Sequence, residues 1–353
     1  MNRHRLNYFN LDITPPLRFI VTFCALAFPI LSFAQDVPCD TLFKRGMDLV
    51  KARDMPAAIE YFKSIEPPSG DLKYDPCYAK VVYALARCNR TQANNYEVIK
   101  GLEEFLSFPE EITNPKARQL SMSLIPDLYR QVGMYEQSHQ KHLLLLAYRD
   151  SIGDSIGLAK SYYELGTLYS DQKNYVQAID YFKQSLAVTV SLRDSTRIIG
   201  SYSALGSNHR ENNNFEKAYE YNQAALDLIP LVSSDKLPEG NKLEPYAEMN
   251  MGSLLLAMGN YGRAKVHLEN SIDIFKEIGY KPGLASAYLD YGSLFERQGA
   301  YDKAIDVFHE GLALSEGINA VIRQSEFHLS LAENYKNINK IDEAYFHLAS
   351  HAD

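Results

Sequence analysis

Apolar side chains recur at helical spacing along most of the chain, in pairs of short segments. The clearest pair covers residues 161–186, where Leu165 and Tyr169 share the face of one segment and Ile179 and Phe182 share the face of the next. A spacing of three or four residues is typical of an amphipathic helix. Two helices of this length cannot bury their apolar faces alone, so each hairpin needs neighbouring hairpins to complete a core.

The pairs repeat at near-constant register. A small residue on the first segment returns every 40 residues, with one interval of 46, at Gly46, Ala86, Pro126, Gly166, Gly206, Gly252, Gly292 and Ala332. Twelve residues later comes a position that is usually alanine, at Ala58, Val98, Ser138, Ala178, Ala218, Ala264, Ala304 and Ala344. Four residues further on the side chain is mostly apolar, at Phe62, Leu102, His142, Phe182, Asn222, Leu268, Phe308 and Leu348. This register predicts an all-α fold of eight hairpins, in which small residues let paired helices approach closely.

The sequence around Leu165-Gly166, with Tyr169, Ala178 and Phe182, resembles the tetratricopeptide repeat, in a variant longer than the usual ~34 residues. The copies at Gly252 and Gly292 match nearly as well. The resemblance implies a right-handed superhelical solenoid of about eight antiparallel hairpins over residues 35–353, whose first helices line a concave groove. Pro126 replaces the preferred glycine in copy three, and we expect it to kink or shorten its helix.

Turn residues separate the helices. A glycine or asparagine that tolerates left-handed dihedrals follows the first helix in five copies, at Gly133, Asn213, Gly259, Gly299 and Asn339. Asp154 and Asp194 are expected to cap the helices that follow them. The Pro-, Gly- and Ser-containing insertion at 233–241 produces the 46-residue interval, and we expect a surface loop with a candidate flexible divide at 232–242.

The first 34 residues are typical of an export signal. Arg3, Arg5 and Arg18 precede an apolar run at 19–34, which ends in the small-residue pattern of a cleavage site. The alternative is an uncleaved anchor, but this run is shorter than the ~20 residues of a spanning helix. We therefore expect a cleaved signal peptide at 1–34 and a periplasmic or secreted product.

The net charge and the lack of catalytic motifs argue against two classes of function, nucleic-acid binding and catalysis. The whole chain carries a formal net charge of -8, and residues 1–34 contribute three Arg against one Asp (+2), which leaves -10 for the remainder. Such an acidic protein repels nucleic acid. We find no motif for a nucleophilic, phosphate-binding or dinucleotide site, and the spaced histidines lack a zinc motif. We predict no enzyme activity, no cofactor and no metal, and we expect the histidines to lie on the surface or in helix seams.

Three cysteines follow the predicted signal. Cys39 and Cys77 occupy nearly the same phase in copies one and two, so the ends of parallel neighbouring helices would bring them close. We predict a Cys39–Cys77 disulfide, with Cys88 left as a packed thiol. The alternative is three small buried thiols.

A basic stripe follows the outward face of the first helices in copies two to five. It contains Lys80, Tyr83, Arg87, Arg90, Arg130, Lys160, Tyr163 and Arg210, with Asp127 as an acidic exception. The corresponding face of copies six to eight carries Tyr246, Met249, Leu256 and Leu289, and then Glu296, Glu326 and Glu333. The basic half is suited to an acidic or carboxylate-bearing polypeptide segment. The alternative is a solvated helix face whose charges pair locally.

These features predict an exported scaffold for protein–protein interaction, which binds a polypeptide in its concave groove and has no stable membrane span after signal cleavage. The alternative is the sensory ectodomain of a signalling protein whose membrane and output modules are absent from this sequence.

Overall fold

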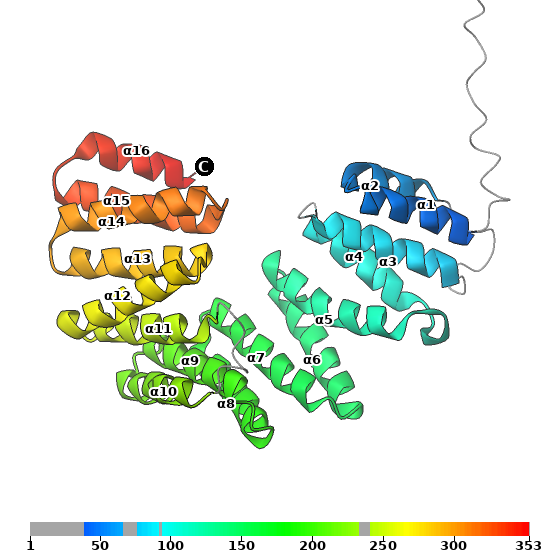
Figure 1. Cartoon of the computed structure of the whole chain (residues 1–353), viewed down its shortest axis with the longest axis horizontal. Coiled ribbons are helices and arrows are strands. Elements are labelled where there is room, and N and C mark those ends of the chain that lie inside the picture. The colour runs from blue at the N-terminus through cyan, green and yellow to red at the C-terminus, as the bar shows by residue number, and fades with distance from the viewer. Residues whose placement is uncertain (1–38, 66–75, 92–93, 233–240, 353) are drawn as a thin grey trace, which may run out of the picture. The chain divides into compact units, whose positions relative to one another are not determined.

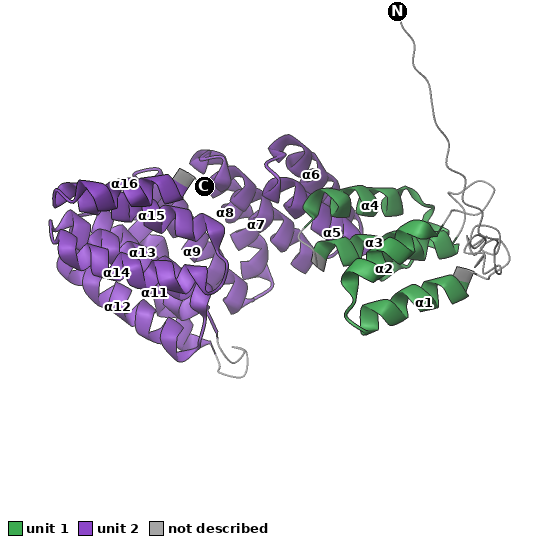
Figure 2. Cartoon of the chain, turned by 90° about the horizontal axis from the view of Figure 1, so that it is seen from above, with its two compact units in different colours: residues 1–117 green, residues 118–353 purple. Residues whose placement is uncertain are grey.

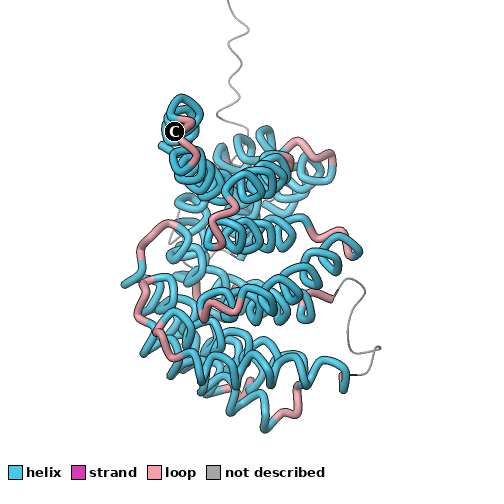
Figure 3. The backbone as a smooth tube through the Cα atoms, turned by 90° about the vertical axis from the view of Figure 1, so that its left-hand side faces the viewer, coloured by secondary structure: helices cyan, strands magenta, loops and turns pink. Residues whose placement is uncertain are grey.

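The helices begin and end where the turn residues predict. The computed structural model describes residues 39–65, 76–91, 94–232 and 241–352, and within these ranges it contains sixteen α-helices, two short 3-10 helices and no strand (Figure 3). The predicted signal peptide lies outside the described residues, as does most of the insertion at 233–241.

The chain divides into two compact units, Met1–Ala117 and Arg118–Asp353 (Figure 2). The described helices of unit 1 are α1 (Cys39–Lys51), α2 (Met55–Ser64), α3 (Pro76–Thr91), α4 (Asn95–Ser107), η2 (Glu110–Ile112) and the first turn of α5 (Pro115–Gln131). Unit 2 holds the rest of α5 followed by α6 (Tyr135–Ser151), α7 (Ser155–Asp171), α8 (Tyr175–Ser191), α9 (Ser195–Glu211), α10 (Phe215–Leu228), η3 (Ile229–Leu231), α11 (Leu243–Ala257), α12 (Tyr261–Glu277), α13 (Lys281–Arg297), α14 (Tyr301–Glu316), α15 (Val321–Asn337) and α16 (Ile341–Ala352).

Consecutive helices pair as antiparallel hairpins, and the hairpins follow one another along unit 2 (Figure 1). Each second helix there packs against the first helix of the next hairpin, as α8 does against α9 and α12 against α13. The first helices also contact one another, since α9 touches α11, α11 touches α13 and α13 touches α15. The first helices α9, α11, α13 and α15 therefore form one continuous layer, the inner layer of the stack. The prediction of an all-α solenoid of helical hairpins is confirmed.

The turns are as regular as the helices. All five predicted turn residues have left-handed backbone, with φ of 76° at Gly133 and Gly259, 73° at Gly299, 57° at Asn213 and 63° at Asn339. The caps are also confirmed, because Asp154 accepts a hydrogen bond from the Gly157 amide and Asp194 accepts one from the Arg197 amide.

The small residues of the repeat accommodate the side chain sixteen positions later. A methyl group on Gly292 would lie 2.2 Å from the Phe308 ring, and one on Gly166 would lie 2.8 Å from the Phe182 ring. The small residues were expected to let the paired helices approach closely. The second-helix alanines Ala58, Ala178, Ala218, Ala264 and Ala304 are fully buried, but the large side chain one turn further on is what fills the space above the glycine.

Copy three departs from its expected geometry. α5 continues through Pro126 and has the same 17-residue length as α7, so the proline does not shorten the helix. The buried Ser138 hydroxyl donates a hydrogen bond of 2.8 Å to the Pro126 carbonyl, which ties the two helices of this hairpin together.

The predicted divide at 232–242 falls mostly on residues that the structure does not describe. The helices on its two sides, α10 and α11, pack against each other inside unit 2, and the boundary between the two units lies at Ala117 and Arg118.

One cysteine of the predicted pair lies outside the described side chains. Cys77 is disulfide-bonded, and Cys88 is a buried thiol outside any disulfide. Because nothing is described of the Cys39 side chain, the pairing of Cys39 with Cys77 stays a prediction.

A substitution tests that pairing. We expect Cys39→Ser to lower the free energy of unfolding of unit 1 by about 2–4 kcal/mol, since the bond would close a loop of nearly forty residues in the unfolded chain. Peptide mapping under non-reducing conditions should recover the Cys39 and Cys77 peptides as one species. Recovery of Cys77 linked to any other cysteine would contradict the pairing.

Candidate functional site

Four of the eight predicted groove residues lie together on α3 in unit 1. Lys80 Nζ pairs with Asp40 Oδ1 at 3.1 Å, and the Tyr83 ring packs against Phe105 at a centroid distance of 4.9 Å. Arg87 lies over the Tyr83 ring, 5.9 Å from its centroid, and is exposed, as is Arg90. Unit 1 thus presents two exposed guanidinium groups, one of which lies over an aromatic ring.

The other four predicted residues lie on α5, α7 and α9 in unit 2, where their charges are paired locally. Arg130 contacts both Asp127, at 2.7 Å, and Asp171, at 2.5 Å. Tyr163 packs edge-on against the Phe182 ring, at a centroid distance of 5.1 Å.

Two further ion pairs complete this set, between Lys160 and Glu164 at 3.4 Å and between Arg210 and Glu211 at 2.8 Å. Asp171, Glu164 and Glu211 were not among the residues predicted for the groove. They neutralise the basic side chains from neighbouring positions.

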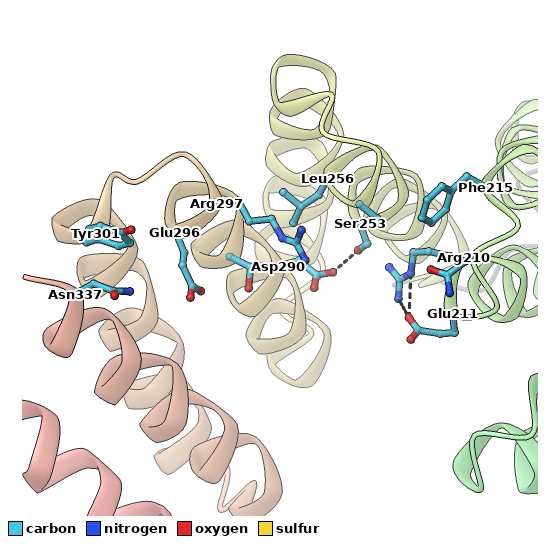
Figure 4. Close-up of a pocket in the computed structure, with 13 residues that line it drawn as sticks. Arg210, Glu211, Phe215, Ser253, Leu256, Asp290, Glu296, Arg297, Tyr301 and Asn337 are labelled. Atoms are coloured by element: carbon cyan, nitrogen blue, oxygen red, sulfur yellow. Dashed lines mark hydrogen bonds and ion pairs between the residues drawn. The ribbon is translucent and has the colours of Figure 1, made fainter.

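A cavity of about 800 Å³ opens in the inner layer of unit 2 (Figure 4). Side chains from first helices, from the hairpin turns and from the first residues of α10 and α14 line it, namely Arg210, Glu211, Asn213, Phe215, Ser253, Leu256, Ala257, Asp290, Ser293, Glu296, Arg297, Tyr301 and Asn337. Arg210, Leu256 and Glu296 were predicted for the inner face of these copies. The cavity is therefore a feature of the predicted groove, with a mixed lining of charged, polar and apolar side chains.

The charges of this cavity are only partly compensated. Arg210 donates from Nε and Nη2 to the same oxygen of Glu211, at 3.1 and 2.8 Å. Asp290 accepts a hydrogen bond from the Ser253 hydroxyl, and desolvation raises the pKa of its carboxyl above the usual range despite that bond. Desolvation likewise raises the pKa of Glu296. The cavity thus holds two carboxylates that burial disfavours in their charged form.

A buried polar cluster lies between α6 and α7, where the sequence pattern predicts an apolar seam. Arg149 donates to the Gly157 carbonyl at 2.9 Å and to the Ser161 hydroxyl at 2.6 Å, and its Nη1 lies 3.9 Å from Glu164 Oε2. His142 is also 3.9 Å from that oxygen, and desolvation lowers its pKa to about 4. These side chains are structural in character, because the arginine and histidine are almost fully buried.

A second group of aromatic and imidazole rings fills the seam of α14, α15 and α16. His347 stacks on Tyr335 at 5.5 Å, and its Nδ1 lies 2.9 Å from Nδ1 of His328. The His309 ring is 5.6 Å from His347. Desolvation, with His328 and His309 nearby, lowers the pKa of His347 to about 4. His142 and His347 thus both lie in buried seams.

The described residues contain no group of three or more His, Cys, Asp or Glu that could hold a metal ion. In the same part of the chain no helix is long and apolar enough to cross a bilayer.

A family model for the tetratricopeptide repeat matches residues 157–230 and 244–317. No curated protein matches the sequence.

Solved structures resemble the chain in fold. A tetratricopeptide repeat protein from Parabacteroides merdae is 18% identical with a TM-score of 0.60, and the match covers 83% of this chain and 98% of that one. A Rap protein complexed with Competence and Sporulation Factor is 14% identical with a TM-score of 0.56, over 89% and 97% of the two chains.

A third similar structure is a signal transduction ATPase from Pyrococcus horikoshii with a tetratricopeptide repeat sensor. It is 14% identical with a TM-score of 0.54, and the match covers 89% of this chain and 45% of that one. The repeat register, the stacked hairpins and the family match together show that the chain contains tetratricopeptide repeats.

Proposed function

We propose that the protein is an interaction scaffold that binds a polypeptide segment along the inner layer of its first helices. The observation that carries this proposal is the cavity of about 800 Å³ in that layer of unit 2, which offers hydrogen-bonding and apolar side chains side by side. Binding sites for ligands are commonly concave and combine apolar walls with a few polar groups. The similar Rap structure, which holds Competence and Sporulation Factor, supports a ligand-binding role for this type of fold.

This role requires binding alone, and we propose no reaction. We also propose that the chain is exported, on the basis of the predicted signal at 1–34. A sensory role is the second candidate, because one similar structure includes a tetratricopeptide repeat sensor. A membrane span and an output module in the same polypeptide would favour the sensor over the scaffold.

In unit 1 we propose that α3 contacts an acidic part of the guest. Arg87 and Arg90 are both exposed, and the Tyr83 ring beneath Arg87 holds one face of its guanidinium. A guanidinium group presents paired donors that match a carboxylate. Arg130, Lys160 and Arg210 already pair with carboxylates of this chain, so they are weaker candidates for the same contact.

Charge reversal on α3 tests the proposal. We expect Arg87→Glu/Arg90→Glu to reduce recovery of the bound polypeptide at least about tenfold, because each lost charge-assisted hydrogen bond contributes roughly 1.5–3 kcal/mol. The measurement is affinity capture with the full-length chain, quantified by mass spectrometry.

The matched control is Lys63→Glu/Lys100→Glu, which makes the same change of charge on exposed positions of α2 and α4. Both variants should keep the helical circular dichroism of the original protein. Equal recovery by the two variants would argue against an acidic guest on α3, and failure to capture any polypeptide with the unaltered chain would overturn the scaffold function.

A further inference from the structure

We propose that the cavity of unit 2 receives a lysine or arginine side chain of the bound polypeptide, held by the carboxylates of Asp290 and Glu296. This inference rests on the proposed function and specifies the chemistry of the guest at one place in the groove. It differs from the basic stripe on α3, which favours an acidic segment.

The first step concerns Asp290 on α13. Its side chain is half-buried and accepts a hydrogen bond from Ser253, but within the described residues it forms no ion pair. Two cations, Arg210 and Arg323, lie near enough to act on it electrostatically, and both are engaged elsewhere, with Glu211 and Glu326 respectively. Asp290 is thus a carboxylate at a cavity wall without a cation of its own.

Glu296, six residues further along α13, is in a similar position. It is half-buried, and the neighbouring Glu333 disfavours its charged form while the Asn334 side chain favours it. A partly desolvated carboxylate is costly unless a cation or several hydrogen bonds compensate it. The pKa values of both carboxyl groups are raised, with desolvation as the largest cause, which is consistent with this lack of compensation.

The rest of the lining favours a cation over an anion. The Arg210 guanidinium already donates two hydrogen bonds to Glu211, and Arg297 is exposed at the edge of the cavity. An anionic guest would therefore meet more carboxylates than available guanidinium groups.

The apolar part of the lining suits the stem of a long basic side chain. Leu256 and Phe215 line the wall beside Ser253, and Tyr301 lies at the Glu296 end (Figure 4). Lysine and arginine bury their methylene groups on apolar surface while the charged head reaches polar partners. Asp290 and Glu296 are about 9 Å apart along the helix axis, so the charged head pairs directly with one of these carboxylates while the other attracts it from a longer distance.

Peptide pools of defined central residue test the inference. The probes are four pools of fluorescent nonapeptides, which carry lysine, arginine, norleucine or glutamate at the central position. The other positions hold an equimolar mixture of amino acids from which Lys and Arg are left out. We expect the full-length chain to bind the lysine and arginine pools about tenfold or more tightly than the norleucine pool in fluorescence polarisation. One charge-assisted hydrogen bond accounts for a difference of this size.

The variant Asp290→Asn/Glu296→Gln should bind all four pools alike. The matched control Asp273→Asn/Glu277→Gln removes the same two charges from exposed positions of α12 and should retain the preference. Equal binding of norleucine and lysine pools by the unaltered chain, or a preference that survives in the Asp290/Glu296 variant, would overturn this inference and leave the scaffold function standing. Absence of binding to every pool would overturn both.

Discussion

Replacement of Phe308 by alanine is expected to lower the free energy of unfolding of unit 2 by about 3–5 kcal/mol, which is the usual range for removal of a buried aromatic ring. Phe308 is fully buried, fits over Gly292 and lies 6.2 Å from the Phe327 ring. Because Gly292 has no side chain that could fill the vacated space, the cavity left behind should persist. The loss should extend to neighbouring hairpins, since each hairpin of a solenoid is stabilised by the next.

Denaturant unfolding followed by circular dichroism measures this effect. The control is Phe346→Ala on α16, which removes the same side chain from a position that is 63% exposed and should change stability by less than about 1 kcal/mol. If the two substitutions destabilised the protein equally, the glycine–phenylalanine contact would not be the stabilising element of the repeat.

The sequence was sufficient for the fold because its periodic signals are local. Turn residues with left-handed backbone recur every 20 residues from Gly133 to Asn213 and again from Gly259 to Asn339, so each helix and its turn are specified independently of the rest. The polar residues in the core were harder to anticipate. His142 and Asn222 occupy the position that is Phe182 and Phe308 in other copies, yet both are almost fully buried.

The electrostatics of the inner layer needed the structure, although one signal was present. Lys80 and Asp40 are 40 residues apart, and Arg130 and Asp171 are 41 apart, so each pair joins first helices of successive copies. A search for opposite charges one repeat apart would have found both. The cavity itself could not be predicted, because its volume depends on the packing of side chains from several hairpins at once.

Acidification is expected to destabilise unit 2 markedly between pH 6.5 and pH 4. His142 and His347 are almost fully buried, and desolvation lowers the pKa of each from 6.5 to about 4. Around His142, Asp127 opposes this shift while Arg130, Arg149 and His139 add to it. Around His347, the nearby His328 and His309 add to it.

The sign follows from proton binding. In this pH window the two histidines bind protons in the unfolded chain but stay neutral in the folded protein, so the free energy of unfolding falls as the pH falls. Each histidine should account for about 2–3 kcal/mol by pH 4.5, since one pKa unit corresponds to about 1.4 kcal/mol. Below about pH 4 the folded histidines also bind protons and the loss levels off.

Urea unfolding at pH 7 and pH 4.5 measures this loss, and substitution assigns it. The raised pKa values of Asp290 and Glu296 act in the opposite direction over the same window, because these carboxyl groups bind protons more readily in the folded state. The difference between variants therefore isolates the histidines. His142→Leu and His347→Leu should each reduce the acid-induced loss by about 2–3 kcal/mol, whereas the control His351→Gln, at an exposed position of α16, should leave it nearly unchanged. An acid-induced loss of the same size in all three variants would mean that the two buried imidazoles bind protons as readily in the folded protein as in the unfolded chain.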